Sequence, residues 1–351
     1  MEKTSDKLLQ IDLRDNVLVA LKPLEKGTSI TWLGESFNLV DDIPAKHKFF
    51  IQDIPAGEKA IMYGVTVGIL QHQVIKGNRM TVDNTKHATD SFDYRNVAFR
   101  WQIPDVSKYS HSTFNGYYRK DGRVGTANYW LFIPTVFCEN RNMDVIKEAL
   151  QNELGYAVTD AYKAYTHQLV EAFKNGEDIN SFNLSSDNVT KKTDRLFNNI
   201  DGIKFLNHQG GCGGTRQDAE TLGKLLAAYA DHPNVAGITL LSLGCQHLQV
   251  TNFLNDLKQR NPSFEKPLII FEQQQSESES VLIKDAIRQT FQQLIEANKA
   301  GRHPAPLSKL CVGVKCGGSD GFSGISANPA VGHCADLLVA LGGTVLLAEF
   351  P

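Results

Sequence analysis

The feature that most constrains the fold is an alternation of apolar runs and helical patterns that begins at Asn128 and continues to the end of the chain. Such alternation predicts a parallel sheet covered by helices. The runs are apolar throughout, as expected for strands that are buried on both faces. We expect strands over 129–136, 202–207, 236–243, 267–272, 309–315 and 343–349. We expect helices over 142–153, 158–174, 216–230, 247–259, 277–299 and 328–341, with a polar, loop-rich insertion over 175–200.

The N-terminal part of the chain has a different pattern. From residue 9 to about residue 86, short apolar runs alternate with glycine turns, which predicts strands. A unit of one apolar residue, two further residues and Gly recurs at Leu24–Gly27, Ile54–Gly57 and Val74–Gly77. Spacings this short indicate turns of one compact β module. The fold class is therefore predicted to be α/β, with a small all-β module followed by parallel-sheet α/β domains.

Bulk composition narrows the function classes. The 351 residues are 42% hydrophobic and 21% charged, typical of a globular protein of two or three domains. The net charge of −3 and the lack of a long basic run argue against a nucleic-acid partner. The N-terminus is polar and no apolar run approaches the ~20 residues of a membrane span. We therefore predict a cytoplasmic protein with no membrane partner. Assembly into a homo-oligomer is compatible with this composition.

The C-terminal end breaks the alternation. The chain stops at Phe350-Pro351, directly after the last predicted strand, and no further element caps that unit. We therefore expect the last domain to be truncated.

Cysteines follow four of the predicted strands. One of them, Cys212, lies within the turn His208–Arg216, whose four glycines let the backbone approach a ligand closely. Ligands of open α/β sheets bind outside the carboxyl ends of the strands. If the strands are parallel, the four cysteines converge on one edge: Cys138, Cys212, Cys245 and Cys316.

Three chemistries fit this set of cysteines. Thiolates bind iron or zinc, and three cysteines on separate loops can hold an iron–sulfur cluster. A cysteine near a helix N-terminus can act as a nucleophile. Small cysteines can also simply fill tight glycine turns. Further polar residues are expected at the same edge: His208, Gln246, Gln273, Gln274, Ser319 and Asp320.

Two other groups are candidates. His47, Asp83, Asn84 and His87 lie next to apolar strands of the β module, where the alternative is an ordinary surface or turn residue. The block Arg119–Asn128 carries two arginines before the first strand of the α/β region. Arg119 and Arg123 suit the binding of an anion such as a carboxylate, and the alternative is a solvated turn.

Several of these stretches together resemble the altronate/galactarate dehydratase family of sugar-acid hydro-lyases, and within it the enzymes that act on altronate. The block CGGSDGFSGISANP at Cys316–Pro329 is long and specific, and the resemblance covers nearly the whole chain. The β module looks like the SAF domain (β-clip-like) with which these enzymes begin. The other matching stretches are Arg119–Asn128, Leu131–Asn140, His208–Gly214, Leu243–Cys245, Gln273–Gln274 and Gly342–Thr344.

Together these features predict a SAF-like module over 1–92, a linker over 93–116, a central α/β domain over 117–300 and the start of a C-terminal α/β domain over 301–351. The resemblance implies removal of water from a sugar acid to give a 2-keto-3-deoxy acid. It suggests Fe²⁺ or Mn²⁺ as the metal.

Roles for individual residues follow as hypotheses from this resemblance. We expect His47 or His208 to be the base, with Asp320 also in the catalytic set, and a metal held by Asp83, Asn84 or the cysteines Cys212, Cys245 and Cys316. We expect the substrate to be bound by Arg119, Arg123, Asn128, Gln273, Gln274 and Ser319.

The chain departs from the family pattern at two places. Members carry a His-x-His-Asn run near the end of the SAF module, where this chain has Thr81-Val82-Asp83-Asn84. Ala127 stands where an arginine often precedes Asn128. The lost histidines favour one alternative function, a non-catalytic sugar-acid-binding protein on the same scaffold. A second alternative, within the enzymes, is dehydration of galactarate or another sugar acid.

Overall fold

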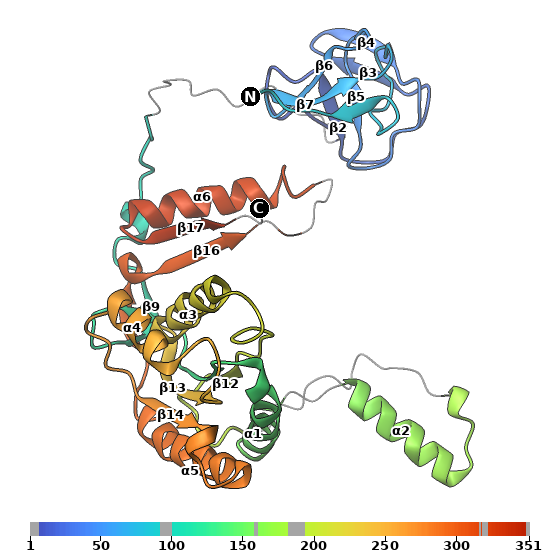
Figure 1. The fold of residues 1–351 in the computed structure, drawn as a ribbon. Helices are drawn as coiled ribbons and strands as arrows, with labels where there is room; N and C mark the ends of the chain where they lie inside the picture. Colours follow the sequence, from blue (N-terminus) through green and yellow to red (C-terminus); the bar gives the residue numbers. More distant parts are fainter. Residues whose placement is uncertain are drawn as a thin grey trace. The chain divides into compact units, whose positions relative to one another are not determined.

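The computed structural model describes residues 7–91, 100–157, 161–181, 194–315, 317 and 322–348. The chain divides into two compact units, one comprising residues 1–110 and 311–351 and the other residues 111–310 (Figure 1). No helix among the described residues is long and apolar enough to cross a membrane.

The N-terminal β module consists of short antiparallel strands. They form three small sheets with the orders β1-β2-β5, β3-β4 and β6-β7-β8. Their bounds are β1 (Leu8–Leu9), β2 (Val17–Ala20), β3 (Ser29–Trp32), β4 (Glu35–Asn38), β5 (Lys48–Phe50), β6 (Lys59–Met62), β7 (Val65–Leu70) and β8 (Thr85–His87). Strand β2 is buried along its whole length, and Phe49 and Phe50 of β5 are fully buried beside it. The prediction of an all-β module is confirmed.

The recurring glycine unit forms the turns of this module. Gly27, Gly57 and Gly77 adopt φ of 84°, 84° and 92°, in the left-handed region that glycine enters without steric cost. The apolar residue that opens each unit is buried. A fourth turn of the same build, Ile43-Pro44-Ala45-Lys46, ends in Lys46 with φ of 71°. The sequence pattern missed this turn because lysine replaces glycine.

The second unit contains a four-stranded parallel sheet with the order β12-β11-β13-β14. Its strands are β11 (Tyr129–Pro134), β12 (Gly202–Phe205), β13 (Val235–Ser242) and β14 (Leu268–Glu272). The helices around it are α1 (Asn140–Glu153), α3 (Arg216–Asp231), α4 (Val250–Arg260) and α5 (Glu279–Ala297). All eight elements match the predicted ranges to within three residues.

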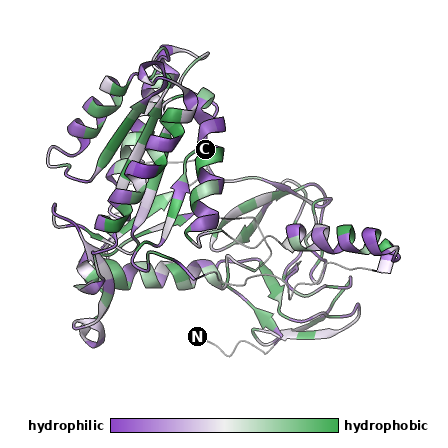
Figure 2. Cartoon of the chain, turned by 90° about the horizontal axis from the view of Figure 1, so that it is seen from below, coloured by the Kyte–Doolittle hydropathy of each residue, from purple (hydrophilic) through white to green (hydrophobic). Residues whose placement is uncertain are grey.

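Helices cover both faces of this sheet. Trp130 and Phe132 of β11 pack against α1 and α5, whereas Leu131 and Ile133 pack against α3 and α4. Alternate side chains of one strand therefore enter two separate cores. The helices in Figure 2 carry both hydrophilic and hydrophobic residues, as expected of helices that bury one face. This arrangement confirms the predicted α/β class.

A small antiparallel sheet was not predicted. Strand β9 (Thr113–Tyr118) pairs with β10 (Val124–Gly125) and with β15 (His303–Pro306). It begins within the segment 93–116 that was expected to be a linker. Prolines at two of the four positions of β15 hid the strand, and they are tolerated because β15 lies at the edge of its sheet.

The C-terminal residues form a separate parallel pair. Strands β16 (Cys311–Lys315) and β17 (Thr344–Ala348) pair with each other and are connected by α6 (Ala327–Ala340). Strand β16 is therefore not part of the four-stranded sheet. The expectation that four strand-end cysteines share one sheet edge is wrong for the strand that precedes Cys316.

The predicted helix over 158–174 is observed as α2 (Ala161–Asn175). It is followed by the single turn η3 (Ile179–Ser181), within the predicted polar insertion. Three further single turns are η1 (Ser107–Tyr109), η2 (Phe137–Glu139) and η6 (Leu307–Lys309). A fourth, η5 (Gln273–Gln275), directly follows β14.

Candidate functional site

The carboxyl edge of the four-stranded sheet contains its topological switch point. From the end of β11 the chain enters α1 on one face, and from the end of the neighbouring β13 it enters α4 on the other face. Loops that diverge in this way leave a crevice in which open α/β sheets bind ligands. Cys138 follows β11 and Cys245 follows β13, so both thiols lie at this switch point.

The glycine turn after β12 crosses the same edge. The Gly210 carbonyl accepts a hydrogen bond from Phe137 N, and the Gly211 carbonyl accepts from His247 N and Leu248 N, at 3.0, 2.9 and 3.2 Å. The turn is thus tied to the loops after β11 and after β13. Gly211 has φ of 93°, and a Cβ there would lie 2.1 Å from the carbonyl oxygen of Thr135. Only glycine lets the turn pass this close to β11.

The Gln246 side chain holds the loops after β11 and β13 together. Its buried amide nitrogen donates to Ser242 Oγ, Thr135 Oγ1 and the Leu248 carbonyl, and its amide oxygen accepts from Gly244 N. The amide nitrogen has two hydrogens for these three acceptors, so its donors are fully engaged in holding the loops. Gln246 is therefore structural.

The two glutamines after β14 complete this edge. Gln274 N donates to the carbonyl of Leu243, which ties the end of β14 to the loop after β13. The Gln274 side chain lies against Gly244, where a Cβ would approach its amide oxygen to 2.6 Å. Both predicted binding residues lie at the carboxyl edge, because they directly follow β14. Gln273 is partly buried and Gln274 is exposed.

Two hollows open beside the glycine turn. One of 400 Å³ is lined by the turn itself, Gln209–Thr215, and by Asp218 and His247. The other, of 360 Å³, is lined by Arg216, Glu220 and the segment Gln246–Gln249. The N-terminus of α3 at this point is already capped, because Thr215 and Asp218 form a reciprocal capping box. Those hydrogen bonds lower the pKa of Asp218, so a carboxylate of the chain occupies the positive end of the helix.

The described thiols do not form a metal site by themselves. Cys138, Cys212 and Cys245 are free, and the first and third are exposed. Among the residues that the structure describes, no three His, Cys, Asp or Glu side chains converge in a way that would hold a metal ion. The described residues alone do not fit the iron or manganese that the family resemblance suggests, and we derive no step through a metal.

His208 is held by the backbone on both sides. Its Nε2 donates to the Pro134 carbonyl at 2.8 Å, and its Nδ1 accepts from Gly210 N at 3.1 Å. A carbonyl only accepts and an N–H only donates, so the ring is the neutral Nε2–H tautomer with no free nitrogen. The geometry does not favour His208 as the general base.

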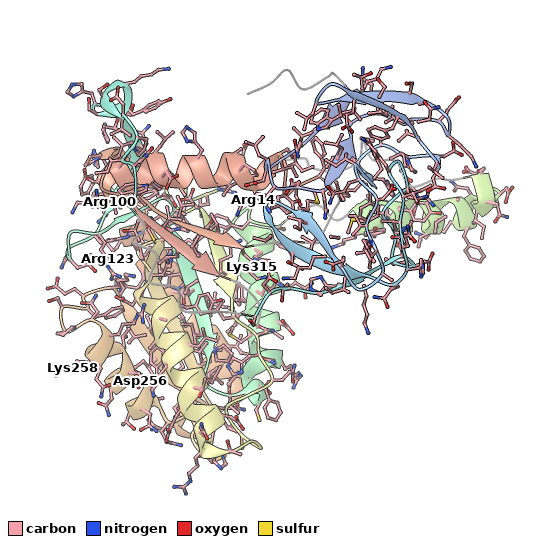
Figure 3. The ribbon with its side chains drawn as sticks, turned by 90° about the horizontal axis from the view of Figure 1, so that it is seen from above. Arg14, Arg100, Arg123, Asp256, Lys258 and Lys315 are labelled. Carbon is pink, nitrogen blue, oxygen red and sulfur yellow. The ribbon has the colours of Figure 1, made fainter. Side chains whose placement is uncertain are left out.

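Arg119, Arg123 and Asn128 lie at the opposite, amino edge of the sheet. Arg119 donates to the carbonyl of Pro233, which precedes β13, and to Asn128, which precedes β11. Arg123, labelled in Figure 3, forms a bidentate pair with the buried Asp231 at the end of α3. The structure does not bring these residues together with the cysteines, in contrast to the single site that the sequence suggested.

A basic pocket lies in the β module. It has a volume of 780 Å³, and its lining includes Lys46, His47, Lys48, Arg79 and His87 but no carboxylate. Lys48 is partly buried, and burial lowers the pKa of its ammonium group. Asp41 accepts a hydrogen bond from Arg79 N, and the positive charge that remains along the pocket wall favours an anionic ligand.

His47 has the free nitrogen that His208 lacks. Its Nδ1 lies 3.2 Å from the carbonyl oxygen of Ala45, so Nδ1 carries the proton in that hydrogen bond. In the neutral imidazole Nε2 is then the acceptor nitrogen, and the exposed ring lines the pocket. Such a nitrogen can accept a proton from a ligand.

The backbone beside His47 is strained. Lys46 occupies the left-handed position that glycine occupies in the three related turns, at a cost of roughly 1–2 kcal/mol for a residue with a Cβ. Strain of this kind is concentrated at functional sites. Sequence analysis missed Lys46, Lys48 and Arg79, although the imperfect fourth copy of the turn is visible in the printed sequence.

The metal role expected of Asp83 and Asn84 finds no support in their surroundings. The Asn84 side chain accepts from Thr81 N and donates to the Arg79 carbonyl, so it shapes its own turn. Asp83 is exposed and forms no hydrogen bond or ion pair with another described residue. The remaining predictions, for Cys316, Ser319 and Asp320, lie outside the described residues.

Glu139 is a further residue of interest that was not predicted from the sequence. It follows Cys138 at the end of β11 and is fully buried, and burial raises the pKa of its carboxyl group. One carboxyl oxygen accepts from Asn142 Nδ2 at 2.9 Å, and the other has no partner among the described residues. A glutamate in a helical segment gives no sequence signal for this environment.

Comparison with known proteins supports the fold and defines its family. A profile described as D-galactarate dehydratase/altronate hydrolase, second domain, matches residues 116–298, which is more than half of the chain. Profiles for the altronate/galactarate dehydratase SAF domain and for the D-galactarate/altronate dehydratase C-terminal region match residues 6–88 and 307–351. The chain therefore belongs to the altronate/galactarate dehydratase family, whose members are hydro-lyases.

Individual relatives agree with this assignment. The chain is 30% identical over 345 residues to altronate dehydratase of Bacillus subtilis (strain 168), and 28% identical over 344 residues to altronate dehydratase of Escherichia coli (strain K12). It is 26% identical over 341 residues to galactarate dehydratase (L-threo-forming) of Escherichia coli (strain K12). The alignments cover 98%, 98% and 95% of this chain but 60%, 60% and 57% of the relatives.

Proposed function

We propose that the chain takes part in the metal-dependent dehydration of a sugar acid, with D-altronate as the substrate and 2-dehydro-3-deoxy-D-gluconate as the product. The observation that carries this proposal is the basic pocket around His47. D-Altronate brings one carboxylate, and the pocket offers cationic side chains and a histidine whose Nε2 makes no hydrogen bond with a described residue. Membership of a hydro-lyase family supports the same reaction class.

The cations would bind and activate the substrate. Lys48 and Arg79 line the pocket. In the proposed complex, their N–H groups donate hydrogen bonds to the substrate carboxylate. Charge that develops on that carboxylate when the C2 proton leaves is stabilised by fixed cations nearby. Burial lowers the pKa of the Lys48 ammonium group, and a bound anion would raise that pKa again.

His47 would transfer the proton. Its Nε2 takes the proton from C2, the C3–O bond breaks, and the imidazolium returns a proton to the departing hydroxyl, which leaves as water. The enol that remains tautomerises to the 2-keto acid. Fe²⁺ or Mn²⁺ stays part of the proposal only through the resemblance, since the described residues alone offer no site for either ion.

A dicarboxylic sugar acid such as galactarate is the second candidate. Three cations line the pocket, Lys46, Lys48 and Arg79, and a single carboxylate does not need all of them. A second terminal carboxylate would use the remaining charge.

The test is turnover by the 351-residue chain. We expect formation of the 2-keto-3-deoxy acid from D-altronate under anaerobic conditions with added Fe²⁺ or Mn²⁺. We expect His47→Gln to lower kcat by about 100-fold or more, the usual contribution of a general base. His72→Gln, a histidine of the same module that does not line the pocket, is the matched control and should retain activity.

Three results would decide between the alternatives. Faster turnover of galactarate than of D-altronate would assign the dicarboxylic substrate. Saturable binding of D-altronate without turnover would indicate a non-catalytic binding protein. Equal activity of His47→Gln and His72→Gln would remove His47 from the mechanism.

A further inference from the structure

A cavity lies at the amino edge of the four-stranded sheet, the edge opposite the glycine turn. It has a volume of 170 Å³, the room of about five water molecules. Its walls are the turn after β9, Tyr118–Asp121, and the segment that leads into β14, Ser263–Pro267. The proposed dehydration makes no use of this cavity.

Arg119 supplies one cation to the cavity wall. Its Nε and Nη2 donate to the carbonyls of Pro233 and Ala127 and to Asn128 Oδ1, at 2.6, 3.2 and 3.0 Å. These acceptors are neutral, and no described carboxylate lies within ion-pair distance of the guanidinium. Nη1 makes none of these hydrogen bonds, so a donor remains for a ligand.

Lys266 supplies the second cation. Its Nζ donates to the carbonyls of Ala230 and His232, at 3.0 and 2.6 Å, and no described carboxylate pairs with it. An ammonium group has three donors, so one remains. Burial, followed by the positive charge of Arg119, lowers the pKa of Lys266 to about 7.

The acidic residues around the cavity are already paired. Asp121 and Asp231 both bind Arg123, at 2.6 Å each. Glu265 forms an ion pair with Lys120 at 2.8 Å. Two partly buried cations therefore face one small cavity without a direct ion pair to a described carboxylate. Asp121 and Asp231 act on Lys266 only through their longer-range negative charge, so an anion that enters the cavity would add direct charged contacts.

We propose that this cavity binds a small oxyanion of phosphate size between Arg119 and Lys266. The guanidinium and ammonium groups each retain a donor, and charge-assisted hydrogen bonds from such donors are the usual contacts of oxyanions. Ser263 lines the same cavity. The site is separate from the basic pocket in the β module, so an anion here is a second ligand and not the dehydration substrate.

The experiment is a calorimetric titration of the 351-residue chain with inorganic phosphate at pH 7, with sodium chloride holding the ionic strength constant. We expect one saturable site. Lys266→Met should weaken phosphate binding by about tenfold or more, because it removes a charged donor. Lys120→Gln, which changes an exposed lysine on the same wall, should alter the dissociation constant by less than about threefold.

Titration with acetate in place of phosphate distinguishes two sources of the oxyanion. Tighter binding of phosphate would indicate a phosphate-bearing ligand, and tighter binding of acetate would indicate a carboxylate. Either result supports the site if Lys266→Met weakens binding of that anion. Two results would overturn the proposal. One is the lack of saturable binding of both anions to the wild-type chain, which does not depend on any variant folding. The other is equal affinity of Lys266→Met and wild type.

Discussion

The two edges of one sheet differ in the chemistry of their side chains. The carboxyl edge carries free thiols, amides and glycines, and its loops are joined largely by backbone hydrogen bonds. The amino edge carries a charged network in which Arg123 binds Asp121 and the buried Asp231. The difference shows that charge density in a sequence does not locate a catalytic site, because the charged block Arg119–Asn128 is used mainly to hold the starts of the strands in place.

The carboxyl edge should be the more sensitive to backbone substitutions. Gly211→Ala should lower the free energy of unfolding by about 3 kcal/mol or more, because the new Cβ meets the Thr135 carbonyl in a left-handed backbone. Gly213→Ala is the matched control. Its φ of 81° is similar but its Cβ meets nothing within 4 Å, so it should cost only about 1 kcal/mol. Urea unfolding measures both, and equal losses would show that the crossing with β11 is unimportant.

The amino edge should be the more sensitive to loss of charge. Arg123→Gln should lower the free energy of unfolding by about 2 kcal/mol, because it leaves the buried Asp231 with weaker partners. Part of the effect is lost to solvent, since the Arg123 side chain is 39% exposed. Lys120→Gln breaks an exposed pair and should cost less than about 1 kcal/mol. A smaller loss for Arg123→Gln than for Lys120→Gln would contradict a structural role for the network.

The amino edge should also respond to pH. Lys266 has a pKa of about 7 in the folded protein, well below the roughly 10.4 of an unfolded chain. Between these values the unfolded state binds more protons, so the free energy of unfolding should rise with pH from about 7 to 10. We expect the rise to be about 1 kcal/mol larger in wild type than in Lys266→Met, after allowing for solvent around the partly exposed amine. Urea midpoints at pH 7 and pH 9.5 test this, and parallel curves would place the Lys266 amine in an ordinary solvated environment.

The sequence predicted the parallel sheet well because its strands are buried on both faces and its helices are amphipathic. It failed where tertiary context overrides local signals. Strand β15 contains Pro304 and Pro306 and exists only because β9 lies beside it. The membership of β16 in a separate pair depends on long-range pairing with β17, which apolar composition does not encode.

The candidate site was predictable only in part. Cysteines at strand ends could be placed at the switch point because the connection rules of α/β sheets apply to any such chain. The partners of Arg119, Arg123 and His208 could not be predicted, since they are backbone carbonyls and side chains far away in the sequence. The hydrogen bond between His47 Nδ1 and the Ala45 carbonyl likewise could not be predicted from the sequence.

The four related turns of the β module can be compared directly, because three copies keep glycine and one carries Lys46. The three glycine copies adopt the left-handed turn without steric strain. The fourth copy therefore lowers the thermal stability of the module, and in return it places a charged lysine beside His47. Lys46→Gly would restore that stability, roughly 1 kcal/mol, and should weaken the response to sugar acids at the same time. This single substitution should therefore raise thermal stability and lower activity.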